Sequence, residues 1–312
     1  MIKKNIILHI GLYKTGSTFI QSHYKLAEFD ECKIFLDNSK IVRLILEYLD
    51  NHNIKIKENI VNIIQNEKSK KILISSEAIF GHQYYHFKDC SKRFRLLEEL
   101  FNQPKYIIFF REPSSIIYSG YFQGLQKSYS LKFENYINEN KNDLFNRNFY
   151  NLFTRGLDYK IYNYNNIFKD YLSIQYRVLF IEYEKFFKEK KGDELIKFTG
   201  LNIHFNFNKK VNKSLKNLIY YELCNKFFLF KYIKIIWIQI NKIFFKYNSA
   251  RDVSLRLIVL INFLVMIIPK KYLKKVDDKN QSLLQEIKSY HSKSYNDFKS
   301  KLNPTLHDGM PK

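Results

Sequence analysis

Short, continuously apolar runs alternate with longer amphipathic stretches over roughly the first two hundred residues of the chain. Runs of this length without polar alternation are typical of strands that are buried on both faces of a sheet. Five such runs predict β-strands, at 5–10, 33–36, 71–75, 106–110 and 178–181. Helical periodicity is found at about 16–27, 40–65, 91–102, 114–127 and 157–172. This order predicts an α/β fold of three layers, with a parallel sheet between two layers of helices.

After Gly200 the pattern predicts helices to the end of the sequence. We therefore expect one domain, with an α/β core at about 1–205 and a helical C-terminal part at about 206–312. The two most apolar stretches, 227–245 and 255–268, favour core helices. Lysines interrupt the first of them, and the second is shorter than the ~20 residues that span a bilayer. The alternative is contact with an anionic membrane surface, which the basic stretch 270–275 would help.

The composition is that of a globular protein with a strong positive charge. Hydrophobic residues make up 46% and charged residues 26% of the 312 residues, which excludes a disordered chain. Lys and Arg number 52 against 30 Asp and Glu, so the formal net charge is +22. Such a charge attracts polyanions. The abundance of Lys, Asn, Ile, Tyr and Phe is also what an A+T-rich genome produces.

Cysteine usage and the N-terminal pattern favour a cytoplasmic protein. Three cysteines, Cys32, Cys90 and Cys224, are far apart and form neither a disulfide framework nor a metal-binding pair. The first apolar run has six residues and contains His9, so it is too short for the apolar region of a signal peptide. We expect His9 to be a core residue of the first strand.

The segment after the first predicted strand has the composition of a phosphate-binding loop. Its characteristic residues are Gly11, Lys14, Thr15, Gly16, Ser17 and Thr18. Backbone N–H groups converge in a turn between a strand and a helix, and the helix dipole adds positive potential. The nucleotide-hydrolase pattern G-x-x-x-x-G-K-[ST] is not met, since Ser17 stands in the place of its lysine. This departure disfavours an ordinary ATPase or GTPase.

A second polar motif follows the fourth predicted strand. Arg111 ends that strand, and Ser119 lies eight residues later on the next predicted helix. A guanidinium fork and a hydroxyl group so placed can converge on one phosphate.

Both motifs, in this order, resemble the sulfotransferases that use 3′-phosphoadenosine 5′-phosphosulfate (PAPS), of the bacterial, carbohydrate-directed type. The family pattern G-x-x-K-T-G-[ST]-[ST] is matched by 11–18, and weaker matches are found at 178–186, 195–201, 211–215 and 289–296. The resemblance implies a P-loop-like fold with the 5′-phosphosulfate on the loop and the 3′-phosphate at Arg111 and Ser119. It implies that Lys14 stabilises the leaving group without a metal. It also implies transfer of a sulfuryl group to a hydroxyl of a carbohydrate or glycoconjugate.

Glu77 is the candidate general base, because it follows the third predicted strand at the sheet edge where ligands bind. The resemblance implies a catalytic glutamate at this position. Burial would raise the pKa of this carboxyl, and Lys14 would oppose that shift. The alternative is a glutamate that only stabilises a helix N-terminus.

His82 and His86 follow Glu77 closely and are candidates for the acceptor side. One of them can serve as the base in place of Glu77; the alternatives are that they line the acceptor cleft or lie on the surface. Their spacing would also suit a zinc pair, but no third ligand of suitable spacing follows.

Two other classes of function stay open from the residues alone. One is a nucleoside or sugar kinase with an altered phosphate loop, which the absence of a lysine directly after Gly16 disfavours. The other is a basic protein that binds polyanions without catalysis. Because no nucleic-acid-binding motif is recognisable, we expect no nucleic-acid partner.

Overall fold

The protein is described by a computed structural model over residues 4–26, 31–81, 87–126, 133–138, 158–190, 192–208 and 270–302. The chain forms two compact units. The first comprises Met1–Ile116, Lys160–Lys213 and His291–Lys312, and the second comprises Ile117–Tyr159 and Ser214–Tyr290. The apolar stretches 227–245 and 255–268 lie outside the described residues, as do His82 and His86.

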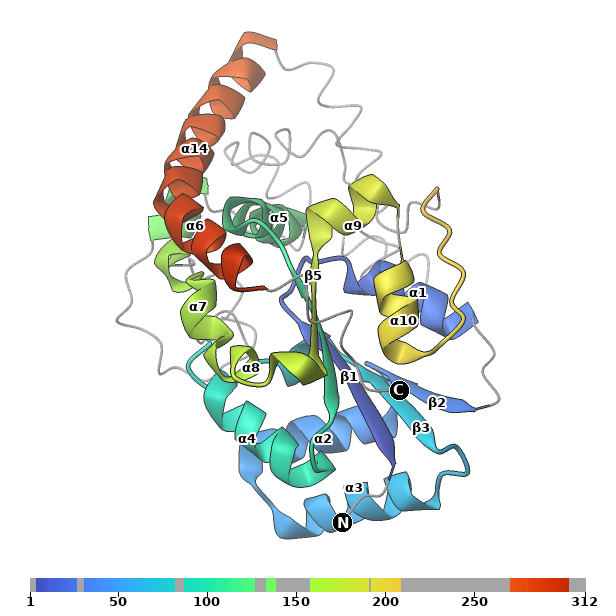
Figure 1. Ribbon diagram of the computed structural model, residues 1–312. Helices are drawn as coiled ribbons and strands as arrows, with labels where there is room; N and C mark the ends of the chain where they lie inside the picture. Colours follow the sequence, from blue (N-terminus) through green and yellow to red (C-terminus); the bar gives the residue numbers. More distant parts are fainter. Residues whose placement is uncertain are drawn as a thin grey trace, which may run out of the picture. The chain divides into compact units, whose positions relative to one another are not determined.

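The five predicted strands form one all-parallel sheet in the first unit (Figure 1). They are β1 Asn5–Gly11, β2 Cys32–Leu36, β3 Lys71–Ser75, β4 Lys105–Phe110 and β5 Val178–Glu182. Their spatial order is β2-β3-β1-β4-β5. The chain leaves β1 toward β2 and leaves β4 toward β5, on opposite sides. The carboxyl ends of the neighbours β1 and β4 therefore form the switch point at which such sheets bind ligands.

The helices of the first unit mostly connect one strand with the next. They are α1 Ser17–Leu26, α2 Lys40–Asn51, α3 Ile54–Asn66, η1 Glu77–Ile79, α4 Cys90–Phe101, α7 Tyr164–Ile167, α8 Lys169–Leu172, η6 Gln175–Arg177, α9 Tyr183–Glu189 and α10 Asp193–Thr199. Two long helices, α5 Pro113–Gln126 and α14 Lys270–Lys301, each belong partly to the first unit and partly to the second. The single turn η5 Tyr159–Ile161 does so as well. The 32-residue α14 confirms the helical C-terminal part.

One face of the sheet packs against α1, α9 and α10. The buried side chains shared by these strands and helices include Ile7, Leu73, Ile107, Leu179, Phe19, Ile20, Phe186, Leu195 and Phe198. Because successive residues of a strand point to opposite faces, the intervening residues are left for the other layer.

The opposite face packs against α4, α7, α8 and the end of α14, mainly through aromatic rings. The edge-to-face or tilted ring pairs that join the layers are Phe94–Tyr106, Tyr106–Tyr171, Phe168–Phe180 and Phe110–Phe298. α2 and α4 lie side by side and are joined by an ion pair, in which Arg93 of α4 donates to Asp50 of α2 at 2.7 Å. The predicted three-layer α/β fold is thus confirmed.

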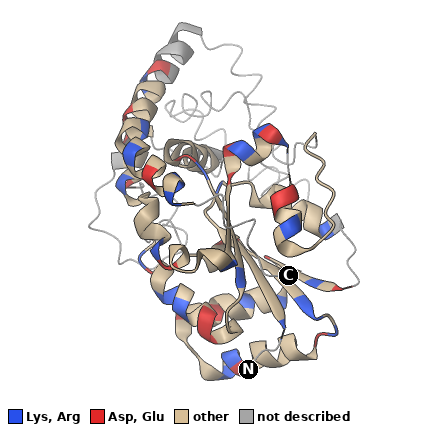
Figure 2. Ribbon diagram, in the orientation of Figure 1, with Lys and Arg blue, Asp and Glu red and all other residues tan. Residues whose placement is uncertain are grey.

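Charge is confined to the outer parts of the sheet. Figure 2 shows Lys, Arg, Asp and Glu on the helices and near the strand ends, whereas the middles of β1, β3, β4 and β5 are uncharged. The continuously apolar runs of the sequence therefore correspond to strands covered on both faces. No helix among the described residues has the length and apolar character needed to cross a membrane.

In the second unit, α6 Phe133–Asn138 packs on the later part of α5. The ring of Phe133 contacts Tyr118 and Tyr121 at centroid distances of 5.3 and 5.0 Å. Lys279 of α14 pairs with Glu134 of α6. These contacts hold segments that are far apart in the sequence within one unit.

Three predicted helical regions differ from the structure. The stretch 40–65 is two helices, because His52 takes the left-handed conformation (φ 55°) and Asn53 then caps α3 by accepting from the Lys55 N–H. The stretch 157–172 is broken into η5, α7 and α8, with Asn163 as the N-cap of α7. Residues 201–208 form no helix. In the first two cases, local side-chain and backbone hydrogen bonds override the apolar periodicity.

Replacing His52 with Gly should stabilise the protein by about 0.5–1 kcal/mol, because glycine adopts the left-handed conformation without the steric cost of a Cβ atom. Urea denaturation of wild type and variant measures this difference. His52→Ala is the control, since it removes the imidazole but keeps the Cβ atom. Equal stabilities of the Gly and Ala variants would contradict backbone strain at this position.

Candidate active site

The loop between β1 and α1 is held in an unusual backbone conformation. Lys14 has φ 68° and Gly16 has φ 88°, both in the left-handed region. A Cβ atom on Gly16 would lie 2.8 Å from the ring of Phe187 and 3.1 Å from that of Tyr183. The loop is stabilised internally by the hydroxyl of Thr15, which donates to the Leu12 carbonyl at 2.6 Å. Only glycine therefore fits the second glycine position of the motif.

The N-terminus of α1 presents backbone donors at this loop. Phe19 and Ile20 both donate their N–H groups to the Gly16 carbonyl, at 2.9 and 3.2 Å. Within the described ranges, the N–H groups of Gly16, Ser17 and Thr18 have no acceptor. These groups and the positive end of the helix dipole suit an anion. The Thr15 side chain is 1% exposed and points into the loop, so a ligand would meet the backbone of this residue and not its hydroxyl.

The phosphate loop and Glu77 meet directly. Glu77 begins η1, two residues after β3 ends, and its Oε1 accepts a hydrogen bond from the hydroxyl of Ser17. Ser17 is 7% exposed and lies at the first position of α1. Two residues that the sequence predicted separately, one for the donor and one for the base, are thus in contact.

Burial raises the pKa of Glu77 from its ordinary value of 4.5 to about 7. The nearby carboxylate of Asp37 adds to this rise, whereas the hydrogen bond from Ser17 and the charge of Lys14 oppose it. A carboxyl group that titrates near neutral pH is a stronger proton acceptor than an ordinary carboxylate and is still partly ionised at that pH. These properties are those expected of a general base.

Two further contacts hold the end of β3 in place. The side-chain amide of Gln21 in α1 donates to the Ser75 carbonyl at 3.2 Å and to Asp37 Oδ2 at 2.9 Å. His9 Nδ1 lies 2.7 Å from the hydroxyl of Ser75. Burial lowers the pKa of His9 to about 3, so its imidazole is neutral at physiological pH. The prediction that His9 is a core residue is confirmed.

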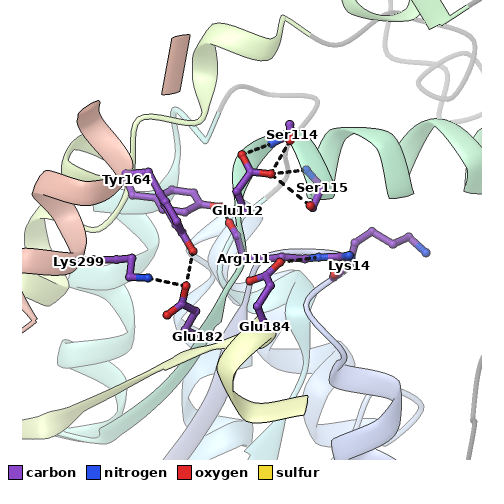
Figure 3. A network of polar contacts seen from close by, with 10 residues as sticks. Lys14, Arg111, Glu112, Ser114, Ser115, Tyr164, Glu182, Glu184 and Lys299 are labelled. Atoms are coloured by element: carbon purple, nitrogen blue, oxygen red, sulfur yellow. Dashed lines mark hydrogen bonds and ion pairs between the residues drawn. The ribbon is translucent and has the colours of Figure 1, made fainter. Parts of the chain in front are cut away.

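Arg111 reaches the phosphate loop from the end of β4. Its Nη1 donates to the Lys14 carbonyl at 3.2 Å, and its Nε donates to Glu184 Oε1 at 3.2 Å. The guanidinium carbon lies 4.3 Å from the centre of the Tyr183 ring. In Figure 3 the Lys14 side chain extends away from this guanidinium, so Arg111 contacts the backbone of Lys14 and not its ammonium group. Lys14, Ser17, Glu77 and Arg111 therefore converge at the switch point of the sheet.

The N-terminus of α5, which follows Arg111, is closed by the chain itself. The carboxylate of Glu112 accepts from the backbone N–H groups of Ser114 and Ser115, each at 3.0 Å, and from both hydroxyls (Figure 3). The anion-binding capacity of this helix end is therefore used internally. Ser119 lies further along α5 in the second unit, and its part in phosphate binding stays a prediction.

Comparisons with known proteins find similarity to solved structures but not to sequence families. No protein-family model matches the sequence, and a search of curated proteins finds no match. Among solved structures, the chain is similar to a sulfotransferase from Alicyclobacillus acidocaldarius, with 14% sequence identity and a TM-score of 0.45. The alignment covers 71% of this chain and 92% of that protein. A likeness of this degree carries no information about chemistry, so the chemistry of the site rests on the side chains of this chain.

The sequence pattern missed several residues of the site because their partners are distant along the chain. Glu184 in α9 binds Arg111, Gln21 in α1 binds the Ser75 carbonyl and Asp37, and the charge of Asp37, in the turn after β2, acts on Glu77. The Y-E pair at 183–184 was visible only as part of a weak family match. Among the described residues, no group of three or more His, Cys, Asp or Glu side chains is placed to hold a metal ion.

Glu77→Gln should change the pH dependence of stability. The pKa of Glu77 is higher in the folded protein than its ordinary value of 4.5, so the folded state binds the proton more tightly. Wild-type stability should therefore fall as the pH rises from about 4.5 to 7, and the neutral variant should escape that loss. We expect the stability of Glu77→Gln relative to wild type to be greater at pH 8.5 than at pH 4.5, by up to about 3 kcal/mol.

Urea denaturation of both proteins at the two pH values measures this change. The comparison at pH 4.5 is the control, because the wild-type carboxyl is then protonated in the folded state and, like the amide of the variant, carries no charge. The same difference in stability at both pH values would contradict a raised pKa of Glu77.

Proposed function

We propose that this protein is a sulfotransferase that moves a sulfuryl group from PAPS to a hydroxyl of a carbohydrate or glycoconjugate. The observation that carries the proposal is the hydrogen bond between Ser17 and Glu77. It joins a carboxyl with a pKa of about 7 to an anion-binding loop of the pattern G-x-x-K-T-G-S-T. A proton acceptor beside an anion site is what group transfer to a hydroxyl requires.

The donor side of the proposed site consists of backbone and cationic groups. The N–H groups of Gly16, Ser17 and Thr18 lack acceptors within the described ranges, and Lys14 adds a positive charge. This set of donors fits a phosphosulfate group, and Arg111 is placed within reach of the same loop. PAPS supplies a sulfuryl group bonded to a phosphate that is a good leaving group. Lys14 and the N–H groups would stabilise the negative charge that remains on the phosphate.

Glu77 is the proposed general base on the acceptor side. As its carboxylate accepts the proton of the acceptor hydroxyl, the acceptor oxygen bonds to sulfur and the bond between sulfur and the phosphate oxygen breaks. Ser17 is positioned to respond to the donor, because its hydroxyl can turn from Glu77 to an anion on the loop. Losing that hydrogen bond would raise the pKa of Glu77 further and strengthen it as a base.

The proposal is tested by comparing ligands that differ in one phosphate position. Calorimetric titration should show tighter binding of 3′-phosphoadenosine 5′-phosphate than of ADP, and transfer from PAPS to sugar acceptors should be measurable without ATP. Lys14→Ala should lower turnover by a factor of about 100 to 1000, because a donor to the developing charge is lost. Preference for ADP, or normal turnover in the variant, would contradict the proposal.

Glu77→Gln should lower turnover by about 10²–10⁴-fold and leave binding of 3′-phosphoadenosine 5′-phosphate intact, because only the proton acceptor is removed. In the wild type, the rate should fall on the acid side of about pH 7, where Glu77 becomes protonated. Ser17→Ala removes a hydrogen bond that lowers this pKa, so the acid limb of its profile should move to higher pH, by about one unit. An unchanged acid limb in Ser17→Ala would contradict an effect of Ser17 on the pKa of Glu77.

A further inference from the structure

We propose that Glu184 is a positioning residue, which holds Arg111 so that the guanidinium clamps the phosphate-binding loop at the carbonyl of Lys14. The clamp consists of Glu184, Arg111 and that carbonyl (Figure 3). Its role in placing the donor phosphates rests on the proposed function. The clamp itself is a property of the folded loop and is observable without ligand.

The geometry of the guanidinium explains why Glu184 matters for Lys14. The five N–H donors of arginine are fixed in one plane, so fixing one edge of the group orients the others. Glu184 Oε1 accepts a hydrogen bond from Arg111 Nε at 3.2 Å, and Arg111 Nη1 lies 3.2 Å from the Lys14 carbonyl oxygen. The ring of Tyr183 covers one face of the plane. Glu184 and Tyr183 thus hold the guanidinium at one edge and one face, independently of its contact with the loop.

The loop needs such a contact because its backbone is strained at the point where Arg111 binds. Lys14 is a non-glycine residue with φ 68°, a conformation that persists only where the surroundings hold it. The same helix, α9, supplies Glu184 to Arg111 and packs Tyr183 and Phe187 against Gly16. One element therefore supports the loop by packing at Gly16 and by charge at Lys14.

The two neighbouring glutamates have other partners. Glu112 binds the first N–H groups of α5, and Glu182 accepts from Lys299 at 2.7 Å (Figure 3). Glu182 also accepts from the hydroxyl of Tyr295 at 3.0 Å. Glu184 is therefore the glutamate of this group that orients Arg111. The Arg111 and Glu184 side chains are 20% and 41% exposed, so their ion pair adds little to global stability. Its effect should be confined to the loop.

Hydrogen–deuterium exchange of the ligand-free protein tests the clamp at the amides of residues 11–20, which include Phe19 and Ile20, whose N–H groups donate to the Gly16 carbonyl. We expect Glu184→Ala to speed exchange there by about two- to five-fold without a matching change in the midpoint of urea unfolding. Glu184→Gln keeps an oxygen for Arg111 Nε and should restore most of the protection. Glu182→Gln is the matched control, since it alters a glutamate two residues away that binds α14, and it should leave the loop unchanged.

Binding of 3′-phosphoadenosine 5′-phosphate to the same variants separates the clamp from the proposed function. A weaker affinity in Glu184→Ala, by a similar factor, supports both. Faster exchange in a protein whose wild type does not bind this nucleotide supports the clamp and contradicts the sulfotransferase proposal. Wild-type exchange at residues 11–20 in Glu184→Ala, or equally fast exchange in Glu182→Gln, overturns the clamp.

Discussion

The candidate site depends on the backbone conformation between β1 and α1, where Lys14 and Gly16 both lie in the left-handed region. This conformation leaves the N–H groups at the start of α1 without acceptors among the described residues and brings the side chain of Ser17 to Glu77. It is held from three sides: by the Thr15 hydroxyl inside the loop, by the rings of α9 at Gly16, and by Arg111 at the Lys14 carbonyl. An anion site of backbone donors requires this rigidity, because donors that must reorganise on binding stabilise charge less.

A balance of opposing electrostatic effects sets the second property of the site. Burial and Asp37 raise the pKa of Glu77, while Ser17 and Lys14 lower it, and the result is a carboxyl that titrates near neutral pH. Without the hydrogen bond and the charge of Lys14, burial would raise the pKa further, so a smaller fraction of the carboxyl would be ionised at neutral pH. If Glu77 were exposed, it would be ionised but a weak proton acceptor. The hydrogen bond between Ser17 and Glu77 therefore affects both sides of the proposed site: it joins the anion-binding loop to Glu77 and lowers the pKa of that carboxyl.

Elements governed by local pattern were predictable from the sequence. The middles of four strands carry no charged residue, and those runs marked the strands within one or two residues. The placement of Lys14 and Glu77 at the same edge of the sheet was predictable as well, because both follow strands of a parallel sheet, whose carboxyl ends share one ligand-binding edge. The break at His52 was not predictable, since the apolar periodicity of α2 and α3 continues across it.

Pairs of residues that are far apart in sequence were beyond prediction for a different reason. Glu184 and Arg111 are 73 positions apart, and Ser17 and Glu77 are 60 apart, so no periodicity relates them. Three glutamates lie near the ends of β4 and β5, and any of them would satisfy the pattern of an acidic partner for Arg111. Only the packing of α9 and α14 decides that Glu184 meets Arg111 while Glu182 meets Tyr295 and Lys299.

The two helix N-termini at the switch point differ in whether their free N–H groups are available to an anion. Both α1 and α5 follow a strand after a short loop and carry hydroxyl residues in their first turn. At α5, Glu112 already supplies a carboxylate to the free N–H groups, so a second anion there would meet repulsion and find no donors. At α1 no acidic residue occupies the first turn, and the nearest carboxyl, Glu77, approaches the side chain of Ser17 and not the N–H groups. The sequence of each turn thus directs an anionic ligand to the loop that also touches the base.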